Sequence, residues 1–235
     1  MTLSIVFTVL GAISLVLYVA EKLRAFTPRA VLRKTLVSAF FVCTALAAAY
    51  AVGKGSYPFF IIGGLVFGLF GDVWLDLKFV YPEDDEPWSR AGFQSFAIGH
   101  ILFMLGMILN YADLSKPLYI VLPLLIAVGC GFAAVLSGPL MKLNYGKYKT
   151  ISIVYGGFLF GTALVAGSLA MQHGWQVKTL NMMFGGGISF ILSDLVLSGT
   201  YFGEGHDKPF DIIANYITYY GAQFTIALSI LFMAS

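Results

Sequence analysis

Charged residues are scarce in this sequence. Lys, Arg, Asp and Glu make up only 11% of its 235 residues, whereas a soluble domain usually carries about 25%. That deficit argues against a water-soluble globular fold. The net charge is only +2 and the Lys and Arg residues are scattered, so no nucleic-acid partner is expected.

Cysteine and histidine are also rare, with two and three residues. Cys43 and Cys130 lie inside apolar runs, which indicates small buried side chains rather than a disulfide or a metal site. The histidines are His100, His173 and His206. Because His173 falls at the outer end of a predicted span, a three-histidine zinc site is not expected. We expect no metal and no other cofactor.

Long apolar runs dominate the chain instead. Hydrophobic residues make up 59% of it, and they come in runs of roughly 20, the length of a membrane-spanning helix. The run from Leu3 to Ala20 is followed, not preceded, by basic residues, which favours a retained span over a signal peptide. The sequence predicts an all-α polytopic bundle forming a single integral membrane domain over residues 1–235. Its eight predicted transmembrane helices cover residues 3–21, 35–53, 58–76, 92–110, 117–137, 149–171, 179–199 and 212–234.

The basic residues indicate an orientation. Of the 14 Lys and Arg residues, all except Lys54, Lys116 and Lys178 fall on one side of the predicted bundle. Positively charged loops remain in the cytoplasm, so both termini are expected outside. The acidic run at residues 83–86 falls in a cytoplasmic loop and is expected to form a solvated turn.

Two aspartates fall inside predicted spans, where an ionisable group costs a few kcal/mol. Asp72 is expected about four residues, or roughly 6 Å, from the cytoplasmic end of the third span. Asp194 is expected about five residues, or roughly 7.5 Å, from that end of the seventh. Each could cap a helix end or pair with Lys34 or Arg33. Two aspartates at one depth nevertheless favour a functional pair.

The segments around these aspartates resemble each other. A Gly-Gly pair, Gly63-Gly64 or Gly185-Gly186, lies eight to nine residues before each aspartate, and three apolar residues follow it. The two aspartates are 122 residues apart, close to half the chain. This pattern predicts two parallel four-helix halves related by an axis along the membrane normal.

Other polar side chains reach the same layer. His100 is expected about 12 Å deep in the fourth span. The eighth span carries Asp211, Asn215, Tyr219 and Gln223 at four-residue steps, hence on one helical face, and a similar stripe follows the sixth span. Such stripes can hold helices together by hydrogen bonds. Because both enter from the side of the aspartates, they also predict a polar cavity open to the cytoplasm.

Two carboxylates in a partly dry cavity do not titrate alike. Burial and mutual repulsion favour protonation of one while its partner stays ionised, which provides a general acid and a general base in one site. Such a pair suits hydrolysis of an acid-labile bond. The sequence leaves open which of Asp72 and Asp194 takes which role.

Four segments resemble motifs of the YhhN, or lysoplasmalogenase, family of membrane proteins. Residues 64–72, GLVFGLFGD, are similar to the family's glycine-rich third span, and residues 93–100, where aromatic residues precede a histidine, to its fourth. Residues 188–194, ISFILSD, resemble the seventh span, and residues 218–223, TYYGAQ, the last-span Tyr-Tyr-x-Ala-Gln motif. Lys34 takes the place of a lysine that usually precedes proline in the family, although Thr35 follows it here.

The resemblance implies an eight-span enzyme, a lysoplasmalogenase-like ether hydrolase. It would cleave the vinyl ether bond of lysoplasmalogen to a fatty aldehyde and a glycerophospho-base, with its active site toward the cytoplasm. The implied partners are a lysophospholipid-like amphiphile as substrate and the lipid bilayer. Asp72 and Asp194 would be the catalytic pair. The residues expected to bind substrate or to orient groups in the site are His100, Tyr155, Tyr219, Gln223, Ser193 and Lys34.

Two other functions fit part of the pattern. A lipid transporter or scramblase would suit repeat symmetry and a polar cavity, but the spans lack the Gly/Pro-broken pairs expected of a midplane site. An intramembrane aspartyl protease also uses two aspartates on two helices. Its usual signature combines Gly-x-Gly-Asp with Pro-Ala-Leu, whereas Gly68-Leu-Phe-Gly71 precedes Asp72 here and Pro-Ala-Leu does not occur.

Overall fold

The computed structural model describes residues 1–24, 28–53, 55–203 and 208–233. Lys54 and His206, which entered the orientation and metal-site predictions, lie outside these ranges. The described residues contain short 3-10 helices, η1 (Pro82–Asp84), η2 (Gly138–Met141), η3 (Gly146–Tyr148) and η4 (Ile230–Phe232), and no strand. They form eight long helices: α1 (Thr2–Lys22), α2 (Pro28–Val52), α3 (Ser56–Val80), α4 (Asp85–Tyr111), α5 (Leu118–Leu136), α6 (Lys149–Gln172), α7 (Lys178–Phe202) and α8 (Pro209–Ser229).

Seven of the helices in the described chain, α1 to α7, are long and apolar enough to cross a membrane. Their outward side chains are apolar as well: Val16, Leu109 and Leu125 are each more than 60% exposed. A surface covered with such side chains is stable against lipid rather than water. The protein is therefore an integral multi-pass membrane protein with an all-helical fold, as the sequence predicts.

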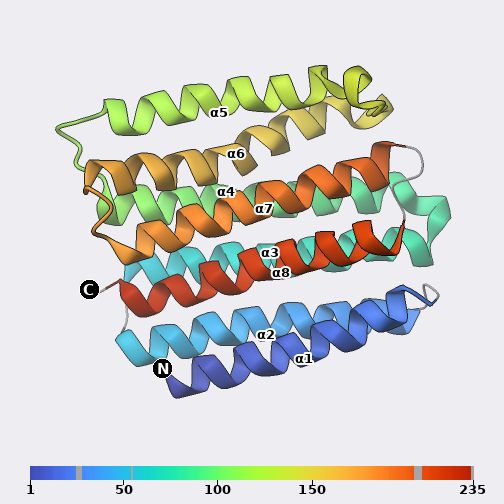
Figure 1. Cartoon of the computed structure of the whole chain (residues 1–235), viewed down its shortest axis with the longest axis horizontal. Helices are drawn as coiled ribbons and strands as arrows, with labels where there is room; N and C mark the ends of the chain where they lie inside the picture. The colour runs from blue at the N-terminus through green and yellow to red at the C-terminus, as the bar shows by residue number, and fades with distance from the viewer. Residues whose placement is uncertain (25–27, 54, 204–207, 234–235) are drawn as a thin grey trace.

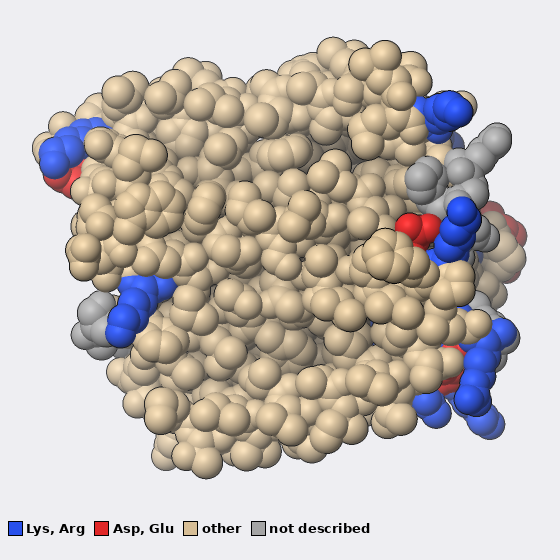
Figure 2. Space-filling model, viewed as in Figure 1, with Lys and Arg blue, Asp and Glu red and all other residues tan. Residues whose placement is uncertain are grey.

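The eight helices lie side by side and run between the same two ends of the molecule (Figure 1). Both termini lie at one end. The last turns of α1, α3, α5 and α7 and the first turns of α2, α4, α6 and α8 gather at the other. In Figure 2, Lys and Arg cluster mainly at that second end, and the long flank between the ends carries no charged residue in this view. We call the second end the basic end.

Several helices extend further toward the basic end than predicted. α2 begins at Pro28 rather than residue 35, α3 continues to Val80 rather than residue 76, and α4 begins at Asp85 rather than residue 92. The added turns carry charged residues, which end an apolar run but not a helix. Asp72 and Asp194 each lie eight residues before the end of their helix, about 12 Å along the axis. This is deeper than the roughly 6 and 7.5 Å predicted from the apolar runs.

The helices contact one another in a repeating order. α1 packs on α2, α2 on α3 and α3 on α4; likewise α5 packs on α6, α6 on α7 and α7 on α8. The two sets meet where α4 packs on α6 and where α8 packs on α2. α7 starts and ends 122 residues after α3, the same spacing as between Asp72 and Asp194. α3 and α7 thus hold equivalent places in the two sets.

Glycines on α3 allow its neighbours to approach closely. A Cβ atom on Gly64 would lie 2.9 Å from the Gly99 carbonyl oxygen, and one on Gly99 would lie 2.9 Å from that of Gly64, so side chains are excluded where α3 crosses α4. One turn further along α3, a Cβ on Gly68 would lie 2.8 Å from Gln223 Nε2 of α8. The absence of a side chain at Gly68 therefore lets α8 reach the wall of α3 beside Asp72.

Candidate functional site

Asp72 of α3 is enclosed by polar groups from two other helices. Ser38 Oγ of α2 donates to its Oδ2 at 2.6 Å, and Tyr219 OH of α8 donates to the same oxygen at 2.7 Å. Lys34 Nζ of α2 lies 3.3 Å from Oδ1. One cation and two hydroxyl donors therefore surround a carboxylate that is only 2% exposed. Charge-assisted contacts of this kind favour the ionised carboxylate.

A second carboxylate, Asp76, shares Lys34 one helical turn closer to the basic end. Lys34 Nζ lies 3.1 Å from Asp76 Oδ1. Tyr18 OH of α1 lies 3.3 Å from Asp76 Oδ2 and 2.7 Å from Tyr216 OH of α8. All four side chains are buried. Residues from α1, α2, α3 and α8 thus meet in one polar cluster.

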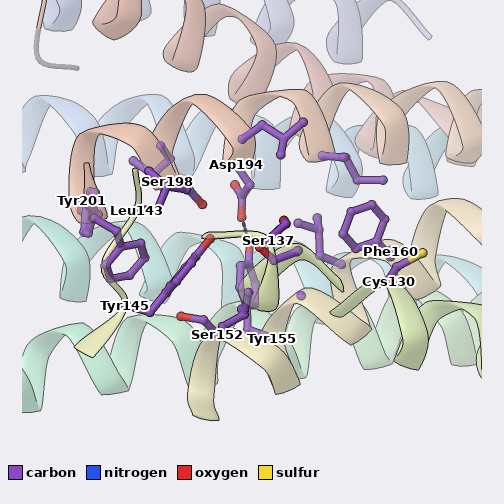
Figure 3. Close-up of a pocket in the computed structure, with 18 of the residues that line it drawn as sticks. Cys130, Ser137, Leu143, Tyr145, Ser152, Tyr155, Phe160, Asp194, Ser198 and Tyr201 are labelled. Atoms are coloured by element: carbon purple, nitrogen blue, oxygen red, sulfur yellow. Dashed lines mark hydrogen bonds between the residues drawn. The ribbon is translucent and has the colours of Figure 1, made fainter. Parts of the chain in front are cut away.

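Asp194 of α7 has a simpler environment. Tyr155 OH of α6 donates to its Oδ2 at 2.5 Å, and Figure 3 shows the two side chains pointing toward each other in the wall of a cavity. In the described part of the chain, no Lys, Arg or His forms an ion pair with Asp194. Arg33 pairs with Glu21 instead. The Lys34 ion pair that the sequence offers as an alternative role therefore forms at Asp72 and not at Asp194.

Both aspartates line one cavity of about 310 Å³, which we call the central chamber. Asp72 lies in the part of its wall that also holds Lys34, whereas Asp194 lies beside Tyr155. The Phe96 ring lies between the two sides: its centroid is 6.0 Å from that of Tyr219 and 6.4 Å from that of Tyr155. The structure therefore brings the two predicted catalytic residues to a shared void, each with its own tyrosine.

A second cavity, the lateral slot, adjoins the central chamber at Asp194 and Tyr155 and has a volume of about 350 Å³. Most of its wall comes from α5, α6, α7 and the segment that joins α5 to α6, and the wall is mostly apolar. In Figure 3 it extends from Tyr145, near the basic end, to Phe160, with Asp194 between them. Leu195 of α7, which lines the slot, is 46% exposed, and Ala133 of α5, on another part of its wall, is exposed as well. The slot therefore opens sideways, toward the lipid.

The side chains of Ser193 and Gln223 lie close to the aspartates, but their hydrogen-bond partners in the described chain are other residues. Ser193 lines the central chamber, and Asn215 Nδ2 of α8 donates to its hydroxyl oxygen at 3.0 Å. Gln223 Nε2 donates to Tyr219 OH at 3.0 Å. Gln223 therefore acts on Asp72 only through Tyr219, and Ser193 ties α7 to α8 beside the chamber.

His100 lies behind both cavities. Its Nδ1 is 2.9 Å from Thr162 Oγ1 of α6, and its ring centroid is 4.8 Å from that of Phe190 and 5.9 Å from that of Tyr155. It lines neither the central chamber nor the lateral slot. The orienting role predicted for His100 is thus limited to packing against Tyr155 and does not extend to a carboxylate.

Three residues of the polar cluster were missed in the sequence. The predicted third span ends at residue 76, and Asp76 has no role in the sequence-based prediction. Its four-residue spacing from Asp72, which places both on one helical face, was the available signal. Ser38 and Tyr18 gave no signal, because serine and a terminal tyrosine are both common in spans.

A model of the YhhN family matches residues 30–230 of the chain. This chain belongs to the YhhN family. The resemblance seen in four short segments is therefore confirmed over most of the sequence. Searches of curated proteins and of solved structures found no match.

The YhhN match includes most residues of the site described above, and those contributed by α1 lie outside it. Lys34, Asp72, Asp76 and Asp194 all fall inside residues 30–230, whereas α1 lies outside them. Tyr18 nevertheless enters the polar cluster from α1. The first helix of this YhhN protein thus completes a cluster whose other members lie within the family match.

The ionisable groups that line the central chamber are carboxylates, phenols and ammonium groups, and most of the remaining wall is apolar. Within the residues that the structure describes, no three His, Cys, Asp or Glu side chains gather into a group able to hold a metal ion. Between Asp72 and Asp76 the structure places the Lys34 ammonium. The chamber is equipped to give protons to a bound molecule and to take them from it.

Proposed function

We propose that this YhhN protein is an intramembrane lipid hydrolase that cleaves the vinyl ether bond of lysoplasmalogen. The observation that carries the proposal is that Asp72 and Asp194 line one chamber with unlike partners, an ammonium for one and a phenol for the other. Unlike environments for two carboxylates are the arrangement that an acid/base pair needs. Membership of the YhhN family is consistent with such an enzyme.

Asp72 is the general base in this proposal. Lys34 and two hydroxyl donors stabilise its charge, and a charged carboxylate can take a proton from water. Asp194 is the general acid. It has no cationic partner among the described residues and borders an apolar slot, which favours a neutral carboxyl group. Tyr155 occupies its Oδ2, which leaves Oδ1 to carry the proton.

The reaction consumes one water molecule. Asp194 gives its proton to the vinyl carbon farther from the ether oxygen, and the π electrons form the new C–H bond. The resulting oxocarbenium ion is attacked at its other carbon by water, from which Asp72 takes a proton, and a hemiacetal forms. Asp72 then returns its proton to the leaving glycerol oxygen while Asp194 removes the hemiacetal proton. The products are a fatty aldehyde and a glycerophospho-base, and both aspartates regain their starting states.

The lateral slot suits the hydrocarbon chain of such a substrate. Its walls are mostly apolar, and it meets the central chamber at Asp194 and Tyr155. An amphiphile with one chain in the slot therefore places the atoms that link chain to glycerol beside the proposed acid. The chamber, with Asp72, lies beside the same linkage and can hold the water.

The proposal includes α8 as an eighth span. Its polar residues Asn215, Tyr219 and Gln223 are buried, whereas Phe210 and Ile217 are 77% and 60% exposed. The inward polar residues lower the mean hydropathy of α8, while an apolar face remains for lipid. α8 also runs between the same two ends as α7 (Figure 1).

The arrangement of the helices supports two further parts of the proposal. The repeated contact order of α1–α4 and α5–α8 supports two parallel four-helix halves. The excess of Lys and Arg supports a cytoplasmic position for the basic end, with both termini outside.

A lipid transporter or scramblase is the second candidate. The observation in its favour is that a slot open to lipid adjoins a polar chamber, an arrangement that can also accommodate a lipid in transit. In that case Asp72 and Asp194 would contact a head group without reacting with it.

Purified protein should be incubated with lysolipids that carry an alkenyl, an alkyl or an acyl chain, and the products identified by mass. Aldehyde and glycerophospho-base are expected from the alkenyl lipid alone. A parallel assay follows labelled lysolipid across liposome membranes containing the protein. Lipid movement without cleavage of any lysolipid would contradict the hydrolase and support the transporter. Release of fatty acid from the acyl lipid would show that the protein cleaves an ester bond instead of the vinyl ether bond.

A further inference from the structure

A third cavity, of about 270 Å³, lies at the basic end of the lateral slot. We call it the mouth pocket. It shares Tyr145, Tyr201 and Phe202 with the slot, so it continues the slot toward the loops. Unlike the slot, the mouth pocket has charged side chains in its wall, among them Lys78 and Asp85. A molecule whose chain fills the slot would place its polar end here.

Asp85 supplies a carboxylate to this pocket. It belongs to the acidic run predicted as a solvated turn. Glu83 and Asp84 are indeed exposed in η1, but Asp85 begins α4 and contacts Tyr148 of η3. Tyr148 OH donates to its Oδ2 at 2.7 Å, and Ser89 Oγ donates to its Oδ1 at 3.3 Å. The Asp85 side chain is still 44% exposed, which leaves room for it to accept a hydrogen bond from a ligand.

Lys78 supplies the opposite charge. Its Nζ lies 3.4 Å from the centroid of the Tyr201 ring and 3.9 Å from Asp85 Oδ1. A separation of 3.9 Å is beyond hydrogen-bond reach, so neither group saturates the other. Lys147 also lines the pocket, but it is 53% exposed and pairs with Glu86 at 3.0 Å. Lys78 and Asp85 are thus the charged pair closest to the slot.

Aromatic rings form much of the remaining wall. The Phe202 ring centroid is 4.5 Å from that of Tyr145 and 6.2 Å from that of Tyr148, and the Phe93 centroid is 6.3 Å from that of Tyr148. Aromatic faces attract ammonium groups, including quaternary ones that cannot donate hydrogen bonds. Rings beside a partly exposed carboxylate are therefore a suitable site for the positive end of a ligand.

We propose that the mouth pocket binds a zwitterionic head group, with Lys78 at its phosphate and with Asp85 and the ring of Tyr148 at its ammonium group. The inference rests on the proposed function and adds the residues that would hold the phosphate and the amine of its glycerophospho-base. The Lys78–Asp85 pair presents one charge of each sign, and a phosphate joined to an ammonium presents the opposite charge to each. A lysolipid without an amine would leave Asp85 unmatched.

Asp85→Asn tests the ammonium contact, because asparagine still offers Tyr148 an acceptor while removing the charge. The measurement is kcat/KM for alkenyl lysolipids bearing phosphocholine, phosphoethanolamine or phosphate alone. A loss of about tenfold, mainly through KM, is expected for the two amine lipids, since one charged contact is worth about that much. Little change is expected for the phosphate lipid. Glu86→Gln, at a neighbouring residue that does not line the pocket, should leave the ratio between lipids unchanged.

A binding measurement separates this inference from the proposed reaction. The probes are a saturated hexadecyl ether of glycerophosphocholine, which has no vinyl bond to cleave, and the same ether lipid bearing phosphate alone. Titration calorimetry with protein in nanodiscs should show that Asp85→Asn and Tyr148→Leu weaken the phosphocholine lipid selectively, and that Lys78→Met weakens both. If these variants weaken binding of the phosphocholine lipid selectively but the protein hydrolyses no lysolipid, the proposed reaction is refuted and the head-group site is retained. If Asp85→Asn and Tyr148→Leu weaken the binding of both lipids equally, or of neither, the head-group site is overturned.

Discussion

Lys34 of α2 forms an ion pair with Asp72 of α3 at 3.3 Å. α6 and α7 are the corresponding pair of helices in the second half of the chain. There, Tyr155 of α6 forms a hydrogen bond with Asp194 of α7 instead. Tyr155 follows Lys34 by 121 residues, almost the spacing of the two aspartates. Similar helix pairs thus present one carboxylate to a cation and the other to a phenol. The two aspartates therefore have different environments, as an acid/base pair requires, because each contacts a different side chain.

Asp72→Asn and Asp194→Asn are each expected to lower the turnover of alkenyl lysolipid by about 10²–10⁴-fold, because each removes one member of the acid/base pair. Asparagine retains an acceptor for Tyr219 or Tyr155, so both variants should elute as folded protein. Asp84→Asn, in the exposed turn between α3 and α4, is the control and should retain activity. A loss smaller than about tenfold in either variant would remove that aspartate from the mechanism.

Lys34→Met is expected to destabilise the fold by about 3–5 kcal/mol, because it leaves buried carboxylates without their cation. The measurement is thermal unfolding in detergent, followed by loss of the monodisperse peak. Adding Asp76→Asn to Lys34→Met removes one of the two carboxylates and should recover part of the stability. Activity should not return with it, since Asp72 would still lack its ion pair. No recovery of stability would contradict the shared ion pair.

Tyr155→Phe and Tyr219→Phe each delete one hydroxyl donor to an aspartate. In the proposed reaction Asp72 is ionised at rest, and Asp194 becomes ionised as it gives up its proton. A hydrogen bond to a charged group is worth about 1.5–3 kcal/mol, so activity should fall roughly 10- to 100-fold. Tyr57→Phe serves as the control, since it deletes a buried hydroxyl that contacts Ser229 in the half of the bundle away from the basic end. It should lower stability and leave activity unchanged. Equal activity losses in all three variants would indicate a general packing defect.

Ala134→Phe should shorten the lateral slot, because Ala134 lines it on α5. Long-chain alkenyl lysolipids should lose kcat/KM while short-chain ones retain it. The matched control is Ala20→Phe on the lipid-facing side of α1, where the added ring meets only lipid. If long and short chains respond alike to Ala134→Phe, the slot does not hold the chain.

The position of the basic end can be tested with an impermeant thiol reagent on intact cells. In a variant with Cys43 and Cys130 replaced by alanine, a cysteine at Asp113 should react from outside, since this exposed residue lies between α4 and α5. A cysteine at Asp84 should react only after the membrane is opened, because basic loops remain in the cytoplasm. Labelling of the Asp84 variant in intact cells would reverse the orientation.

The sequence predicted much of this architecture because apolar runs report directly on helices in lipid. It also placed Asp72 and Asp194 at one depth, since helical rise converts residue number into distance along the axis. It could not predict rotation about that axis. His100 has a suitable depth, but its ring points to Thr162 rather than to either cavity.

Contacts between helices distant in sequence were equally unreadable. Nothing local to Tyr18 shows that α1 lies beside Asp76, and Asp76 falls at the last residue of the predicted third span. The sequence predicts that Asp85 faces solvent together with its acidic neighbours, because a run of charged residues does not show which side chain contacts the rest of the protein. Each of these residues is placed by the packing order of the helices, which hydropathy does not encode.

Asp194 lies part-way along the lateral slot, between the end of the slot at Phe160 and the end that continues into the mouth pocket. A lysolipid cleaved at Asp194 is divided into an apolar fragment and a polar fragment. In the proposed reaction the aldehyde retains the chain and no charge, so it partitions into the bilayer, while the glycerophospho-base partitions into the aqueous phase. Neither fragment spans both cavities, so neither can rebind with the affinity of an intact substrate. Cleavage at this position would let solvent partition clear both products, without a carrier for either one.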